Sequence, residues 1–131
     1  VKKYLDEQIK FAKDNGFVKT IYNRRRPVPE ITSSNFMQRQ FGERVAMNSP
    51  IQGTAADIMK IAMINVGKAL KESGFDARIV LQIHDELLVE VKDEQKDQVK
   101  EIIEHTMRNA AELKASLEVD AHTGKSWLQA K

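Results

Sequence analysis

The sequence contains no cysteine among its 131 residues. Without cysteine there is no disulfide framework and no thiolate metal site, which fits a cytoplasmic protein. Long apolar runs are also missing, since nothing approaches the roughly 18 apolar residues that indicate a membrane-spanning helix. The segment that begins at Val1 lacks the apolar core of a signal peptide. We therefore expect a cytoplasmic protein with no membrane partner.

Charge of a single sign does not dominate the chain, whose net charge is +2, but the two halves differ. Residues 1–60 carry 11 Lys+Arg against 6 Asp+Glu, and residues 61–131 carry 10 against 13. A basic half suits a polyanionic partner such as nucleic acid. Unevenly scattered solvated charge would give the same counts, so the asymmetry alone does not decide between these interpretations.

Apolar periodicity and turn residues predict the order of the elements. In chain order we expect helices or strands at residues 4–15 (helix, closed by Asn15-Gly16), 17–22 (strand), 36–47 (helix), 51–73 (helix), 77–92 (hairpin), 93–113 (helix, capped by Asp93) and 117–122 (strand). There are no repeats and no long linker. The expected fold class is α+β, with helices packed on a small antiparallel sheet in one domain or part of one.

The predicted hairpin carries three polar residues, His84, Asp85 and Glu86, at its tip. Apolar residues alternate with others at 79–83 and again at 87–91, the period of a strand. Two carboxylates on a rigid tip present the oxygen ligands that Mg²⁺ prefers. A plain polar turn is the alternative, because Asp is common in turns. The tip lacks the Gly or Asn-Gly that short hairpins favour, which adds weight to a chemical role and leaves both interpretations open.

A second unusual pattern is the spacing by four of Arg44, Asn48 and Gln52. On a continuous helix these side chains share one face, although Pro50 makes the alignment approximate. Arg, Asn and Gln can donate to the minor-groove acceptors of DNA, which are nearly the same for every base pair. These three side chains are therefore candidates for contacts that check the shape of a DNA base pair and do not depend on the base sequence. An exposed polar helix face is the alternative.

The remaining candidates each have a simpler interpretation. Arg24, Arg25 and Arg26 are candidate phosphate contacts or a solvated surface turn. Asp57 is expected to be a paired structural carboxylate rather than a metal ligand. Neither His105, on a solvated helix face, nor His122 has a partner at metal-ligand spacing. Trp127 is expected to anchor the end of the chain by packing.

Three segments, taken together, resemble the C-terminal palm region of bacterial family A DNA polymerases, the DNA polymerase I type. They are Arg24-Arg25-Arg26-x-x-Pro29, the run from Glu43-Arg44 through Asn48-x-Pro50-x-Gln52-Gly53-Thr54-Ala55-Ala56-Asp57, and Gln82-Ile83-His84-Asp85-Glu86, the family's motif C. The resemblance covers residues 1–131, which it implies are a single C-terminal fragment of a polymerase domain.

The resemblance implies a role for each motif residue. Asp85 would bind catalytic Mg²⁺, Glu86 would support the metal site and primer end, and His84 would lie near the primer-terminal nucleotide. The helical row, residues 44, 48 and 52, would contact the minor groove of primer–template DNA. The implied reaction is attack of the primer 3′-hydroxyl on the α-phosphate of a dNTP, with two metal ions and release of pyrophosphate.

The resemblance also implies what these 131 residues lack. The family's other essential Asp and the fingers helix that holds the dNTP lie upstream. We therefore expect the chain alone to be inactive and to self-associate through an open strand edge. Two other functions stay open from the residues themselves. One is a non-enzymatic nucleic-acid-binding α+β module, and the other is a metal-dependent phosphohydrolase that uses His84 and Asp85.

Overall fold

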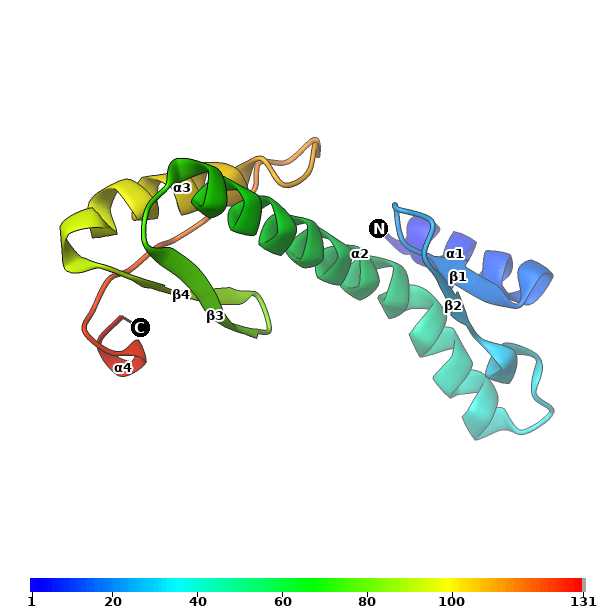
Figure 1. Ribbon diagram of the computed structural model, residues 1–131. Coiled ribbons are helices and arrows are strands. Elements are labelled where there is room, and N and C mark those ends of the chain that lie inside the picture. The colour runs from blue at the N-terminus through cyan, green and yellow to red at the C-terminus, as the bar shows by residue number, and fades with distance from the viewer. Residues whose placement is uncertain (131) are drawn as a thin grey trace. The chain divides into compact units, whose positions relative to one another are not determined.

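A computed structural model describes residues 1–130 and confirms an α+β fold (Figure 1). The elements in chain order are α1 (Lys2–Asn15), β1 (Phe17–Lys19), β2 (Arg25–Pro27), the 3-10 helix η1 (Pro29–Thr32), α2 (Phe36–Ser73), β3 (Ala77–Ile83), β4 (Glu86–Val91), the 3-10 helix η2 (Asp93–Gln95), α3 (Lys96–Arg108) and α4 (Trp127–Ala130). The chain divides into two compact units at Asp57/Ile58, and each is described by itself.

The first unit packs α1, the β1–β2 pair and the start of α2 around one small core. As predicted, α1 ends at Gly16, whose φ of +80° is the left-handed cap conformation and whose N–H donates to the carbonyl of Ala12 (2.7 Å). The buried core residues are Ala12, Val18, Val28, Ile31 and Ala46. These small aliphatic side chains fix β1 and η1 against the helices.

The strand predicted at 17–22 is shorter, because the chain turns back after Lys19. The Thr20 N–H donates to the carbonyl of Arg24 (3.0 Å), and Asn23 takes a positive φ of 66°, which Asn tolerates. The chain then returns as β2, whose Arg26 pairs with Val18 of β1. Part of the arginine run is therefore a strand rather than only a turn.

A single helix, α2, replaces the two helices predicted at 36–47 and 51–73. Its first turn is capped by Asn35, whose Oδ1 accepts from the N–H groups of Met37 (3.0 Å) and Gln38 (3.3 Å). Pro50 is buried inside the helix and does not end it. A proline removes one N–H donor and disfavours the helix locally, and here packing outweighs that cost.

The second unit packs the β3–β4 hairpin against α3 and the last turns of α2. Its buried core residues are Val66, Leu70 and Val99, and the inner hairpin side chains that cover them are Ala77, Ile79, Leu87, Val89 and Val91. The alternation predicted from 79 to 83 is interrupted, because a β-bulge lies between Ile79 and Leu81. The extra residue reverses the facing of the strand, so Leu81 is 40% exposed.

Two further predictions in this unit are wrong. The last long helix, α3, begins at Lys96 with Gln95 as N-cap, so Asp93 is not its cap, and it ends at Arg108 rather than near 113. The expected strand at 117–122 has no regular structure. A β-branched or apolar run becomes a strand only when another strand offers hydrogen bonds, and both sheets in residues 1–130 have two strands already paired with each other.

Within residues 1–130, no helix combines the length and apolar character needed to cross a membrane.

Candidate active site and nucleic-acid interface

The tip of the β3–β4 hairpin is a two-residue turn. Ile83 pairs with Glu86, so only His84 and Asp85 lie between the strands, and Glu86 is the first residue of β4 rather than part of the turn. His84 has a φ of +51° without being glycine. A non-glycine residue in this region is uncommon and costs about 1–2 kcal/mol. The turn therefore keeps a residue with a side chain in a backbone conformation that glycine adopts more easily.

A neighbouring side chain ties down this turn. The Gln82 amide Nε2 donates to the backbone carbonyl of His84 at 2.7 Å. The side chains of His84, Asp85 and Glu86 are all exposed. Sequence reasoning placed Gln82 in the motif C segment but assigned it no role.

The chemistry of the tip fits a hard cation, because carboxylate oxygens are the ligands of Mg²⁺. Asp85 and Glu86 would hold it, and both are accessible. Across residues 1–130 there is no group of three or more His, Cys, Asp or Glu side chains arranged to hold a metal ion. The two carboxylates therefore fit part of a coordination sphere, which other oxygen ligands would have to complete.

The predicted polar row lies on one continuous helix. Arg44, Asn48 and Gln52 all belong to the part of α2 in the first unit, and all three are exposed. With about 1.5 Å of rise per residue, the row extends about 12 Å along the helix. That length corresponds to roughly three or four base-pair steps of B-DNA at about 3.4 Å each.

The three arginines of the 24–26 run have different environments. Arg24 Nε donates to Asp57 Oδ1 at 2.6 Å, and its Nη2 donates to the carbonyl of Gly53 at 3.2 Å. This ion pair confirms the expectation that Asp57 is a paired structural carboxylate. Arg25 stacks over the Phe17 ring, with 4.4 Å from the guanidinium carbon to the ring centroid.

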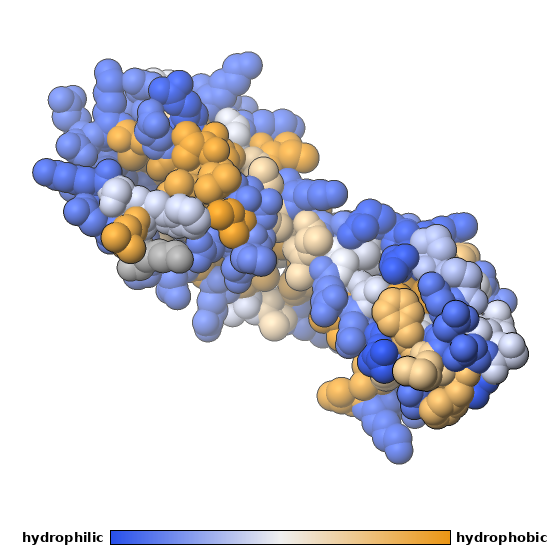
Figure 2. All heavy atoms as spheres, turned by 90° about the horizontal axis from the view of Figure 1, so that it is seen from below, coloured by the Kyte–Doolittle hydropathy of each residue, from blue (hydrophilic) through white to orange (hydrophobic). Residues whose placement is uncertain are grey.

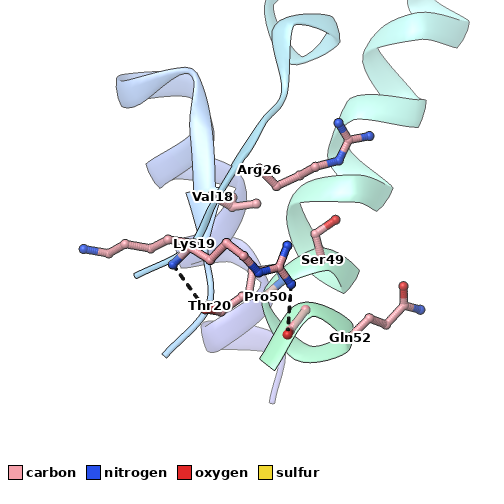
Figure 3. A pocket seen from close by; sticks show the side chains of 9 residues that line it. Val18, Lys19, Thr20, Arg26, Ser49, Pro50 and Gln52 are labelled. Atoms are coloured by element: carbon pink, nitrogen blue, oxygen red, sulfur yellow. Dashed lines mark hydrogen bonds between the residues drawn. The ribbon is translucent and has the colours of Figure 1, made fainter. Parts of the chain in front are cut away.

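Arg26 lies beside an open cavity of about 240 Å³ in the first unit (Figure 3). Lys19 and Arg24 also line it, together with Pro50 and Gln52 of α2. In Figure 3 the Gln52 side chain extends from α2 away from the β1–β2 loop. The cavity brings part of the arginine run beside one end of the polar row, a proximity that the sequence did not reveal.

The two remaining histidines and the tryptophan lie at least 19 residues after the hairpin tip in the sequence. His105 is exposed on α3 and His122 is exposed in the irregular segment before α4. Trp127 begins α4 and is 40% exposed.

The DNA polymerase family A model matches residues 1–129, so the chain belongs to DNA polymerase family A. Over all 131 residues it is 53% identical to DNA polymerase I of Caldicellulosiruptor bescii and 48% identical to DNA polymerase I of Lactococcus lactis subsp. lactis IL1403. The chain covers 15% of the length of each of these relatives.

A solved structure of the polymerase domain of Pol1 from M. smegmatis, in complex with DNA primer–template and dNTP, is similar to this chain. The TM-score is 0.94 and the identity is 44%, with 98% of this chain and 23% of that chain covered.

Proposed function

We propose that this chain is the part of a DNA polymerase that supplies the motif C metal ligands and a minor-groove contact surface for template-directed DNA synthesis. The observation that carries the proposal is the exposed Asp85–Glu86 pair at a strained hairpin tip, within a chain that belongs to DNA polymerase family A. The primer–template and dNTP in the similar M. smegmatis structure support DNA and dNTP as partners.

The reaction joins a dNTP to the primer. The primer 3′-hydroxyl oxygen forms a bond to the α-phosphorus, the bond from that phosphorus to the bridging oxygen breaks, and pyrophosphate leaves. Asp85 would be the principal ligand of Mg²⁺, with Glu86 beside it, and His84 would lie against the primer-terminal nucleotide. When bound, Mg²⁺ supplies neutralisation of the negative charge at the transferring phosphoryl group.

The helical row would hold the primer–template near the growing end. The side chains of Arg44, Asn48 and Gln52 all carry N–H donors, which suit the purine N3 and pyrimidine O2 acceptors of the minor groove. Because all four base pairs present these acceptors, such contacts would not depend on template sequence. Arg25 and Arg26 would add contacts to phosphate, for which guanidinium groups are well suited.

The metal site would need ligands from outside these 131 residues. Two-metal catalysis holds two ions about 4 Å apart, and Asp85 with Glu86 provides only part of the oxygen ligands for such a pair. The 131-residue chain alone would therefore not extend a primer.

A chimeric polymerase tests the proposal. In C. bescii DNA polymerase I, these 131 residues replace the matching segment, which is 53% identical. We expect the chimera to extend a primer in the presence of Mg²⁺ and all four dNTPs, and we expect the purified 131-residue chain to incorporate nothing. A chimera that folds, binds primer–template and fails to extend it would overturn the proposal.

A further inference from the structure

The loop between β1 and β2, residues 20–24, is joined to the segment of α2 at residues 50–57 by three contacts. The Ile21 N–H donates to Thr54 Oγ1 at 3.2 Å. Arg24 donates to the Gly53 carbonyl and to Asp57 Oδ1, which lie one helical turn apart. A single guanidinium therefore spans successive turns of the same helix.

Three residues of this segment, Pro50, Gly53 and Thr54, weaken the helix locally. Pro50 lacks an N–H, so it cannot donate to the carbonyl four residues earlier. Gly53 costs about 1 kcal/mol relative to alanine in a helix interior. The Thr54 hydroxyl donates to the carbonyl of Pro50 at 2.6 Å, a bond that bends helices. The contacts from the β1–β2 loop therefore support a part of the helix that needs stabilisation.

The buried partner makes the ion pair more than a surface contact. The Asp57 side chain is 10% exposed, whereas that of Arg24 is 52% exposed. The 2.6 Å separation is that of a charge-assisted hydrogen bond. Losing Arg24 would leave a carboxylate mostly out of water without this cation, which is costly.

We propose that Arg24 is a positioning residue, which through Asp57 and the Gly53 carbonyl fixes the helical turn that presents Gln52 to primer–template DNA. Gln52, which is labelled in Figure 3, is exposed. Its neighbour Gly53 accepts the hydrogen bond from Arg24. The inference rests on the proposed function of Gln52. Arg24 then differs from Arg25 and Arg26, since its guanidinium serves the protein rather than the phosphate backbone.

A double-mutant cycle in the chimeric polymerase tests this, with kcat/KM for primer–template as the readout. We expect Gln52→Ala and Arg24→Gln each to lower kcat/KM about tenfold, the size of one hydrogen bond to a charged or buried group. Because both changes remove the same contact with DNA, the double variant should lose little more than Gln52→Ala alone.

Arg26→Gln is the matched control. It removes the same charge two residues away, and the Arg26 guanidinium Nη1 donates to the carbonyl of Pro27 in its own strand, at 3.4 Å. The fold-losses in kcat/KM of Arg26→Gln and Gln52→Ala should multiply in the double variant. The unfolding temperature of every variant is measured, and if Arg24→Gln fails to fold, Arg24→Lys takes its place, because lysine keeps the charge without the fork that reaches both acceptors.

The outcomes separate the inference from the proposed function. Losses that multiply for Arg24 as they do for Arg26, or no loss at Arg24, would overturn the positioning role while leaving Gln52 as a DNA contact. No loss for Gln52→Ala would overturn both the proposed minor-groove role and this inference.

Discussion

At the scale of single residues, the most informative position is His84. It adopts a φ of +51° in a two-residue turn, between a strand that ends at Ile83 and one that begins at Glu86. Residues held in unfavourable backbone conformations cluster at functional sites, because the surrounding structure maintains them for a purpose. Here the hydrogen bond from Gln82 to the His84 carbonyl helps to maintain the turn.

We predict that His84→Gly leaves the free energy of unfolding of the 131-residue chain unchanged or raises it by up to about 1.5 kcal/mol. Glycine relieves the strain of a positive φ, about 1–2 kcal/mol, and adds unfolded-state entropy worth about 0.5–1 kcal/mol. Urea unfolding measures the difference. His105→Gly, in the middle of α3, is the control and should lose about 1 kcal/mol. An equal or larger loss at His84 would contradict the strain argument.

At the scale of elements, α2 decides how the first unit presents polar side chains. Because the helix continues through Pro50, Arg44, Asn48 and Gln52 share one exposed face. We predict that Arg44→Ala and Gln52→Ala in the chimera each weaken extension by about 1–3 kcal/mol, with similar losses for all four template bases. Steady-state extension on four templates measures this. A loss confined to one base would show sequence readout instead.

Two glycines of α2 have opposite surroundings, and the same substitution should therefore have opposite effects. A Cβ at Gly53 would lie 2.8 Å from Thr20 Cγ2, whereas a Cβ at Gly67 meets nothing within 4 Å. We predict that Gly53→Ala lowers the free energy of unfolding by about 1–3 kcal/mol, from overpacking. Gly67→Ala should raise it by about 0.5–1 kcal/mol, from helix propensity.

A second substitution checks the cause at Gly53. Thr20→Ser removes Cγ2 but keeps the hydroxyl that accepts from the Tyr22 and Arg24 N–H groups. It should restore most of the stability lost in Gly53→Ala, as measured by urea unfolding. Failure of Thr20→Ser to rescue would show that the close approach to Thr20 is not the reason for glycine at this position.

Some of the helices and strands could be predicted from the sequence, and others could not. Local signals were enough for α1 with its Gly16 cap, for the start of α2 at residue 36 and for the hairpin. The continuity through Pro50 and the missing strand at 117–122 depend on packing and on partner strands, which periodicity does not report. The bulge after Ile79 could not be predicted without knowing which residues pair across the hairpin. One extra residue reverses which side chains face the core, and the composition of the strand does not reveal it.

For the candidate site, residue types suggested the chemistry and spacing suggested the shared helix face. The sequence could not show that Arg24 pairs with Asp57, 33 residues away. It also could not show that the turn contains only His84 and Asp85, since that depends on which residues pair across the hairpin.

At the scale of the whole molecule, each of the two sheets in residues 1–130 has only two strands, so every strand leaves an edge without a neighbour. Apolar side chains also reach the surface, as Figure 2 shows in orange, and on the hairpin they include Val80 (49% exposed) and Leu81. Open edges and exposed apolar surface favour association between chains.

We predict that the 131-residue chain associates as its concentration rises, measured by sedimentation velocity. Val80→Lys should reduce the association, because a charge on the hairpin opposes pairing of strand edges. Leu128→Lys removes an exposed apolar side chain from α4, which has no strand edge, and should change the association less. A chain that stays monomeric at all concentrations would contradict the prediction.

Asp85 at the hairpin tip is the residue that we propose holds the metal for nucleotidyl transfer. Single-nucleotide incorporation by the chimeric polymerase in Mg²⁺ tests this proposal most directly. Asp85→Ala should lower the rate about a thousandfold or more, since a Lewis-acid metal contributes several kcal/mol, and Glu86→Ala should lower it less. Asp93→Ala, an exposed carboxylate in η2, is the control and should leave the rate unchanged. A near-normal rate for a folded Asp85→Ala chimera would contradict the account.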